Sequence, residues 1–279
     1  MVKTTARVAW IDGLKFFAIL LVVWGHVLPR LGMYSGEYAF TGLHGFIYSF
    51  HMPLFMTLSG YVSYKIVDGE IDIFRKFRQL IVPCITLFVI CLAVGLDENY
   101  WYLKSLFLCY CLFGLYIKVG LKYKLIFCLF GCIAIFPLLY KVPYLSCCKI
   151  DFMLPFFGIG LLIRKYSSNI ENNLFFYLLL SFILFLLCEL LWNKEYIWYY
   201  SRPSWINYRS LVCGHELIIN LENIFQVVFR YFTGAIGTLF FVTLFMALYK
   251  YEYKWALLAV LKNWGGGILY TSIFYIHLL

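Results

Sequence analysis

Charged side chains are scarce in this chain, and their scarcity excludes an ordinary soluble domain. Only 13% of the 279 residues are Asp, Glu, Lys or Arg, and 63% are hydrophobic. Soluble domains average about 25% charged and about 45–50% apolar residues. The mean hydropathy of +0.83 and the long, continuous apolar runs predict an all-α, polytopic transmembrane helical bundle. A membrane β-barrel is excluded, because its strands alternate in segments of about ten residues.

Zinc-ligand and disulfide spacings are also lacking. Ten cysteines occur without any Cys-x-x-Cys pair, and most lie inside apolar runs, where cysteine behaves as a small hydrophobic residue. We therefore expect no metal cofactor. The sequence contains no internal repeat, no low-complexity tract and no small-residue cleavage site after the first apolar run. We expect a retained first span and a single integral-membrane domain over residues 1–279.

Nine apolar runs approach the length that a helix needs to cross a bilayer, which is about 20 residues. The predicted spans are 8–28, 44–64, 79–96, 101–118, 122–140, 150–164, 173–192, 225–249 and 264–279. The only long polar connection, 193–224, is expected outside the cell as a re-entrant or interfacial segment. The bundle should therefore have about 9–10 spans.

Positive charge is distributed unevenly between the two sides of these spans. The formal net charge is +9, and fourteen loop Lys and Arg residues fall on the side of the N-terminus against seven on the other side. Loops rich in Lys and Arg remain in the cytoplasm. The asymmetry predicts a cytoplasmic N-terminus, and it accounts for the basic charge of the chain without nucleic-acid binding.

Two ionisable residues, Lys15 and His26, lie inside the first apolar run. A charged group there costs roughly 2.5–3.5 kcal/mol on insertion scales, so such residues usually have a function. They are eleven residues apart. In a helix this spacing is three turns plus roughly 20°, so both side chains share one face, about 16 Å apart along the axis. Histidine suits proton transfer, because its ordinary pKa of about 6.5 lets it exchange a proton near neutral pH.

Structural roles stay open for these residues and for their neighbours. Lys15 can extend to the cytoplasmic surface, and His26 can cap the outer end of its helix. Asp12 lies one turn before Lys15, where a carboxylate lowers the cost of burying the cation. His51, in the second span, is expected at the depth of His26, either within the site or as a packed histidine bonded to the backbone.

Arg75 and Arg78 lie in the segment FRKFRQ at the cytoplasmic start of the third span. A spacing of three places both guanidinium groups near one side of a helix. Guanidinium groups match phosphate oxygens with paired hydrogen bonds, and the dipole of a helix N-terminus also favours anions. The positive-inside rule explains the same residues, so a phosphate site and a plain cytoplasmic loop both stay open.

Weaker candidates lie near the outer surface. Glu189 in the seventh span and Arg230 in the eighth are each about one turn from that surface, and a structural ion pair explains both. His215 and Glu216 in the polar connection are expected on a solvated face. His277 lies in the last predicted span.

Taken in order, these motifs resemble those of the membrane-bound acyltransferase family 3. RVAWIDGLKFFAILLVVWGH resembles the family signature of Arg or Lys, ten residues, then His, which falls on Lys15 and His26. FHMPLFMTLSGY resembles the following span, with His51, and RKFR matches the Arg-x-x-Arg element, with Arg75 and Arg78. Within the family the chain is most similar to the sugar O-acetyltransferases of bacterial capsule and exopolysaccharide clusters.

The resemblance implies a reaction and roles for these residues. Acetyl-CoA on the cytoplasmic side would donate the acetyl group, and a sugar hydroxyl outside, including that of a lipid-linked glycan, would accept it in the bacterial inner membrane. His26 would act as general base, Arg75 and Arg78 would bind the donor phosphates, and Lys15 would line the path of the pantetheine arm. Direct transfer and a covalent acetyl-histidine both stay open. No metal is implied.

Two alternatives concern the span count and the class of protein. The family usually has ten spans, so either 193–224 contains one or another follows residue 279, and the resemblance favours the second. A transporter or flippase of a lipid-linked glycan would also use buried ionisable groups and an outer loop. Transporters often show two related halves, which this sequence lacks. A non-catalytic scaffold does not explain Lys15 and His26.

Overall fold

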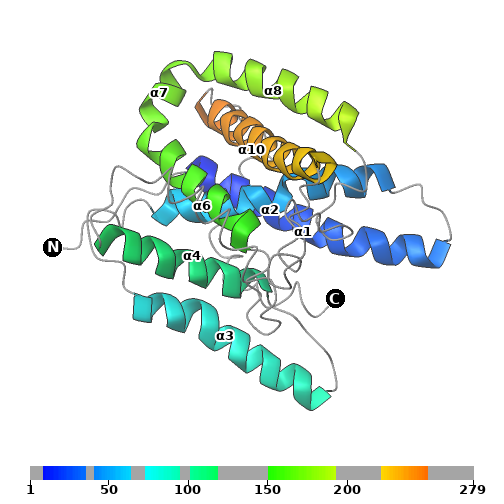
Figure 1. Cartoon of the computed structure of the whole chain (residues 1–279), viewed down its shortest axis with the longest axis vertical. Coiled ribbons are helices and arrows are strands. Elements are labelled where there is room, and N and C mark those ends of the chain that lie inside the picture. The colour runs from blue at the N-terminus through cyan, green and yellow to red at the C-terminus, as the bar shows by residue number, and fades with distance from the viewer. Residues whose placement is uncertain are drawn as a thin grey trace, which may run out of the picture. The chain divides into compact units, whose positions relative to one another are not determined.

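The computed structural model describes residues 9–35, 41–63, 73–94, 101–118, 150–192 and 221–250. All eight elements in these ranges are α-helices, and no strand occurs among the described residues (Figure 1). The all-helical prediction is therefore confirmed. Three of the described helices are long and apolar enough to cross a membrane, over Ala9–Leu28, Leu174–Leu191 and Phe225–Lys250.

The helices follow the predicted order of spans. They are α1 (Ala9–Ser35), α2 (Thr41–Ser63), α3 (Ile73–Val94), α4 (Trp101–Lys118), α6 (Ile150–Lys165), α7 (Ser167–Asn172), α8 (Leu174–Leu191) and α10 (Leu221–Lys250). The short helix α7, between α6 and α8, was not predicted. The predicted spans 122–140 and 264–279 and the segment 193–220 lie outside the described residues, so the total number of spans stays a prediction.

Three helix ends differ from the predicted ones by four or more residues. Helix α1 continues to Ser35 rather than ending at 28, and α3 begins at Ile73 rather than at 79. Helix α10 begins at Leu221 rather than 225, so the last four residues of the predicted polar connection belong to it. The reason is that hydropathy detects the part of a helix inside the hydrocarbon region, whereas the backbone hydrogen bonds continue beyond it.

The chain forms two compact units. Unit 1 consists of Met1–Phe55, Tyr166–Trp205 and Asn220–Leu279, and unit 2 consists of Met56–Lys165 and Ile206–Ile219. Helix α2 contributes to both units. Its residues up to Phe55 belong to unit 1, and those from Met56 belong to unit 2.

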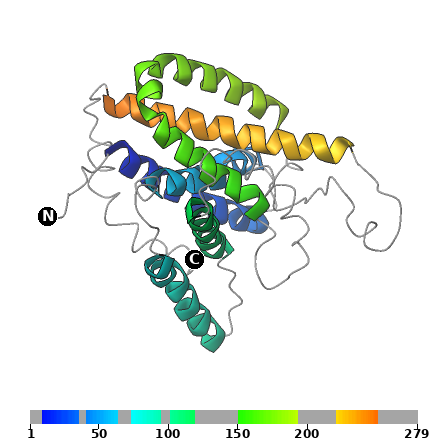
Figure 2. The same cartoon turned by 60° about the vertical axis from the view of Figure 1, so that its left-hand side comes forward.

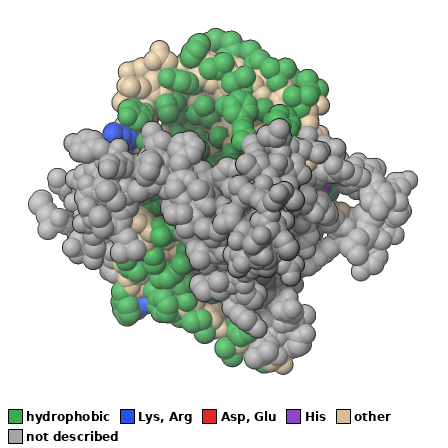
Figure 3. Space-filling model, viewed as in Figure 1, with side chains coloured by type: hydrophobic (Ala, Val, Ile, Leu, Met, Phe, Trp, Pro, Cys, Tyr) green, Lys and Arg blue, Asp and Glu red, His purple; other side chains and the backbone are tan. Residues whose placement is uncertain are grey.

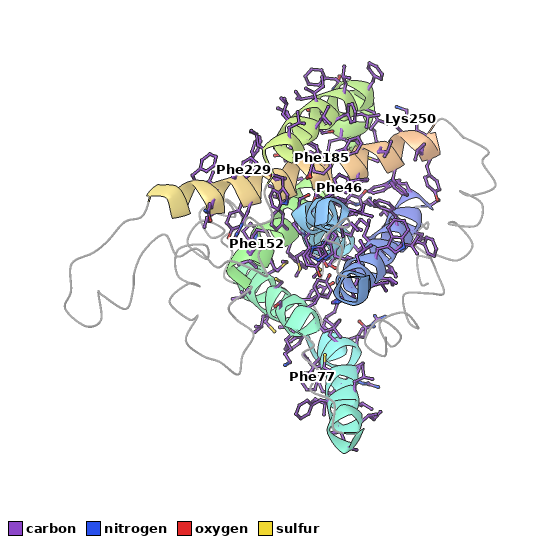
Figure 4. The ribbon with its side chains drawn as sticks, turned by 90° about the vertical axis from the view of Figure 1, so that its right-hand side faces the viewer. Phe46, Phe77, Phe152, Phe185, Phe229 and Lys250 are labelled. Atoms are coloured by element: carbon purple, nitrogen blue, oxygen red, sulfur yellow. The ribbon has the colours of Figure 1, made fainter. Side chains whose placement is uncertain are left out.

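An aromatic cluster forms the core of unit 1, where α8 lies beside α10 (Figures 1 and 2). The ring of Phe50 on α2 stacks on Phe241 of α10 at 4.4 Å between centroids and meets Phe185 of α8 edge-on at 5.5 Å. Figure 4 labels Phe185 beside Phe46, a further ring of this cluster at 5.7 Å. The glycine at position 237 makes room for the Phe185 ring, because a Cβ atom there would lie 2.7 Å from that ring.

In unit 2, the end of α2 and helix α6 approach each other closely. A Cβ atom on Gly60 would collide with the carbonyl oxygen of Phe157, and one on Gly160 would collide with the carbonyl oxygen of Thr57. The Thr57 hydroxyl donates a hydrogen bond to the Phe156 carbonyl at 3.1 Å. Small residues and hydroxyl hydrogen bonds are the usual means by which membrane helices pack, since burial of apolar surface gives little drive in lipid.

The exposed face of α8 is almost entirely apolar. Figure 3 shows hydrophobic side chains gathered at the top of the view, the position of α8 in Figure 1. Large apolar residues exposed on α8 are Phe175, Phe176, Leu179, Leu180, Phe182, Ile183, Leu186, Leu187, Leu190 and Leu191. Water would disfavour such a continuous surface, whereas lipid tails match it. This chain is therefore a membrane protein.

Candidate functional site

Helix α1 is continuous from Ala9 to Ser35, so Lys15 and His26 do share one helix face, as predicted. Helix α10 packs on the other side of α1. The ring of Phe17 lies 5.0 Å from that of Phe241, and Gly13 faces the hydroxyl of Tyr249. Lys15 is two residues from each of these contact positions, which is a rotation of roughly 200° around the helix. Lys15 therefore lies on the side of α1 that faces away from α10. Lys15 is half-buried and His26 is exposed.

Three residues of α2, His44, Tyr48 and His51, form a row of rings in contact, each tilted against the next. The ring of Tyr48 lies 4.1 Å from that of His44 and 4.7 Å from that of His51, measured between centroids. Both histidines are buried, whereas Tyr48 is half-buried. Spacings of four and seven residues place the three side chains on one face of the helix.

Tyr48 joins this row to α1. Its hydroxyl donates a hydrogen bond to the carbonyl oxygen of Gly25 at 3.3 Å. A Cβ at position 25 would lie only 3.0 Å from the Tyr48 ring, so glycine permits this approach. His26 follows directly and is close enough to His44 and His51 to interact with both electrostatically. The structure therefore gathers three histidines and one tyrosine in unit 1.

Of these four residues, His44 and Tyr48 were not predicted from the sequence as site residues. The signal that would have found them is the spacing of 44, 48 and 51 on one face of a predicted span. His51 also has a structural role: its Nδ1–H donates to the carbonyl oxygen of Ile47 at 2.8 Å. Because a carbonyl oxygen only accepts, Nδ1 carries the hydrogen and Nε2 is left as the acceptor of the neutral ring. Participation of His51 in chemistry stays a prediction.

Glu189, at the end of α8, is tied to α2 through Ser49. The Ser49 hydroxyl donates to a carboxylate oxygen of Glu189 at 2.6 Å, and Ser49 itself is buried. Arg230 on α10 is only 1% exposed. The buried cation and the half-buried carboxylate fit a structural role in unit 1, and the ion pair between them stays a prediction.

The predicted phosphate ligands Arg75 and Arg78 lie within the first two turns of α3, in unit 2, and both are exposed. One of the two residues between them, Lys76, behaves differently. Lys76 is half-buried, and its Nζ atom lies 4.3 Å from the centroid of the Tyr110 ring. Lys76 was counted only as a loop charge in the sequence, because hydropathy does not show which way a residue at a helix end turns.

A second cation of unit 2, Arg164 near the end of α6, also contacts a tyrosine. Its guanidinium group donates to the Tyr61 hydroxyl at 2.9 Å and lies 5.1 Å from the centre of that ring. Within the described ranges, no group of three or more His, Cys, Asp or Glu side chains lies close enough together to hold a metal ion.

Comparison with known proteins identifies the family. A family model described as an acyltransferase domain, of acyltransferase family 3, matches residues 8–263. No curated protein and no solved structure was found to match the chain. The matched range includes the Lys15–His26 face, the histidine row of α2 and the basic start of α3. The chain belongs to acyltransferase family 3 and is an integral-membrane acyltransferase.

Proposed function

We propose that this protein transfers an acetyl group from cytoplasmic acetyl-CoA to a hydroxyl of an extracytoplasmic or lipid-linked sugar in the inner membrane of a bacterium. The observation that carries the proposal is the position of His26, exposed on α1 and within electrostatic range of the histidines of α2. An imidazole there can accept a proton from a bound hydroxyl. Membership of an acyltransferase family supports this reaction over transport of a glycan.

The reaction assigns His26 the role of general base. Its imidazole removes the proton of the sugar hydroxyl while that oxygen attacks the thioester carbonyl. The new carbon–oxygen bond forms, the carbon–sulfur bond breaks, and the imidazolium returns the proton to the departing CoA thiolate. The products are an acetyl ester and free CoA, so atoms and charge balance without a metal. A covalent acetyl-histidine is the two-step form of the same chemistry.

Other residues bind the donor in this proposal. Arg75 and Arg78 are exposed and one turn apart on α3, and guanidinium groups pair with phosphate oxygens. Lys15 shares the helix face of His26 and is half-buried, so its ammonium group can contact the carbonyl oxygens of the pantetheine arm. Asp12, one turn before it, is half-buried and offsets its charge.

The test is transfer from labelled acetyl-CoA by membranes or purified protein that carry His26→Ala. The rate should fall by about 10²–10⁴, the usual contribution of a positioned general base, while the protein still accumulates in the membrane. Leu20→Ala is the matched control, because Leu20 is exposed on another side of the same helix. A His26→Ala rate above about a tenth of wild type would show that His26 is not the general base.

A further inference from the structure

We propose that Lys76 and Arg164 form a phosphate-binding site at the end of α2, which takes the diphosphate of the nucleotide donor in addition to Arg75 and Arg78. The inference rests on the proposed function, since it assumes a donor of the CoA type. It concerns two cations that neither the family signature as quoted above nor the predicted site includes.

Both cations are connected to the last turn of α2, Arg164 directly and Lys76 through Tyr110 of α4. Arg164 donates to the hydroxyl of Tyr61, and Lys76 lies over the ring of Tyr110. The Tyr110 hydroxyl in turn accepts a hydrogen bond from Ser63 at 2.9 Å. Tyr61 and Ser63 stand in the last turn of α2, so these contacts gather the two cations around the end of one helix.

The two cations are turned inward, which the positive-inside rule does not require. That rule concerns how many Lys and Arg residues a cytoplasmic loop carries, and exposed residues such as Arg75, Arg78 and Lys165 satisfy it. Lys76 and Arg164 instead lie against tyrosines that are only 5% and 4% exposed. A tyrosine ring orients a cation and offsets part of its charge, but leaves it able to bind an anion.

No carboxylate in the described part of unit 2 lies near these cations. The only acidic residue in those ranges is Asp151, at the start of α6. It precedes Arg164 by thirteen residues, which is roughly 20 Å along the helix. The described residues of unit 2 also include Arg75, Arg78, Lys118 and Lys165 as further cations near helix ends. Among the described residues of unit 2 the charges near these helix ends are therefore mostly positive, and an anion matches them.

Phosphate is the chemistry that such a pair recognises, and two sources can supply it: the diphosphate of the donor and the headgroup of an anionic lipid. The neighbouring hydroxyls favour the donor. Next to Lys76, the hydroxyls of Ser63 and Tyr110 are hydrogen-bonded to each other, and that of Ser59 lies 3.3 Å from that of Tyr102. These hydroxyls make the surroundings of Lys76 polar, which suits the polar pantetheine arm better than an acyl chain.

The experiment measures binding of coenzyme A to purified protein in nanodiscs of neutral phosphatidylcholine. Lys76→Gln and Arg164→Gln should each weaken binding by about tenfold or more, the loss expected for a charge-assisted contact to phosphate. Lys76→Arg should retain most of the affinity. Lys165→Gln is the control, because it removes the exposed neighbouring charge of the same helix turn and should change affinity by less than about twofold.

A second measurement needs no variant. An amine-reactive reagent followed by mass spectrometry reports the labelling rate of each lysine of the wild-type protein. Coenzyme A should slow labelling of Lys76 and leave that of Lys165 unchanged, and inorganic pyrophosphate should produce the same protection. If the glutamine variants do not accumulate, the labelling measurement alone tests the inference. Labelling of Lys76 that saturating coenzyme A does not slow contradicts it.

The outcomes separate the two proposals. If the wild type binds no coenzyme A, the proposed donor is wrong, and this inference is overturned with it. If the wild type binds coenzyme A and both glutamine variants bind it equally well, only this inference is overturned. It is also overturned if nanodiscs containing phosphatidylglycerol protect Lys76 and coenzyme A does not, since the site then belongs to a lipid headgroup.

Discussion

Tyr48 and Gly25 join the histidine row of α2 to the helix that carries His26, through the hydrogen bond from the Tyr48 hydroxyl to the Gly25 carbonyl at 3.3 Å. The bond lies one residue before His26 in the chain. A carbonyl held by a tyrosine on a neighbouring helix restrains the backbone that positions the imidazole. In the proposed mechanism Tyr48 is a positioning residue, and its removal should affect turnover.

Tyr48→Phe should lower kcat by about two- to tenfold, because a neutral hydrogen bond contributes about 0.5–1.5 kcal/mol. The KM for acetyl-CoA should change little, since the proposed phosphate ligands Arg75 and Arg78 belong to α3. Initial rates over a range of donor concentrations measure both constants. Tyr177→Phe, at a tyrosine of α8 outside the site, is the control and should behave as wild type. A reduced amount of protein with unchanged kcat would assign Tyr48 a purely structural role.

His44→Gln tests whether His44, which the sequence analysis did not single out, takes part in the reaction. Glutamine keeps a hydrogen-bonding group of similar size but cannot carry a proton at neutral pH. We expect a lower kcat, with normal accumulation and normal donor binding. His51→Gln should instead reduce accumulation, because the hydrogen bond of His51 to the Ile47 carbonyl is buried. Equal behaviour of the two variants would contradict this division of roles.

Arg75→Ala and Arg78→Ala should chiefly weaken donor binding. The loss of a charge-assisted contact to phosphate should cost about 1.5–3 kcal/mol in apparent donor affinity. Titration of coenzyme A against equal amounts of folded variant measures this loss. If the two arginines only fix the orientation of the chain in the membrane, the variants will change topology or accumulation instead. The affinity of each folded molecule for coenzyme A will then stay the same.

Gly60→Ala and Gly160→Ala should prevent normal packing of unit 2. At each position the added Cβ would collide with a backbone carbonyl oxygen of the facing helix, which cannot move without shifting that helix. We expect reduced accumulation and a lower melting temperature in detergent. Gly42→Ala is the matched control, because a Cβ there meets nothing within 4 Å. Similar melting temperatures for all three variants would show that the two helices separate easily.

The sidedness predicted from the loop charges is directly measurable. Single cysteines at Ser201 and Asp68, in a background without the ten native cysteines, can be labelled with an impermeant thiol reagent on intact cells. Position 201 should label, and position 68 should label only after the membrane is opened. The reverse pattern would place the arginine pair outside the cell, away from coenzyme A, and would exclude the proposed transfer.

The sequence alone determined the class of this protein and the spacing of its principal candidates. Apolar runs of bilayer length predict helices, because every backbone N–H and C=O group inside lipid must be hydrogen-bonded within the protein. Helical periodicity then places Lys15 and His26 on one face, and the order of motifs indicates the acyltransferase family that the comparison confirmed. These properties depend only on residues close together in the chain, so they can be recognised in the sequence before the fold is known.

Only the tertiary structure decided which side chains of different helices meet. Nothing in the local pattern shows that Tyr48 reaches Gly25, that Ser49 binds Glu189, or that Lys76 turns onto Tyr110 while its neighbouring arginines remain exposed. Such contacts depend on the rotation and depth of each helix. In a membrane these are set by packing against other helices, because lipid surrounds every apolar face with equal preference.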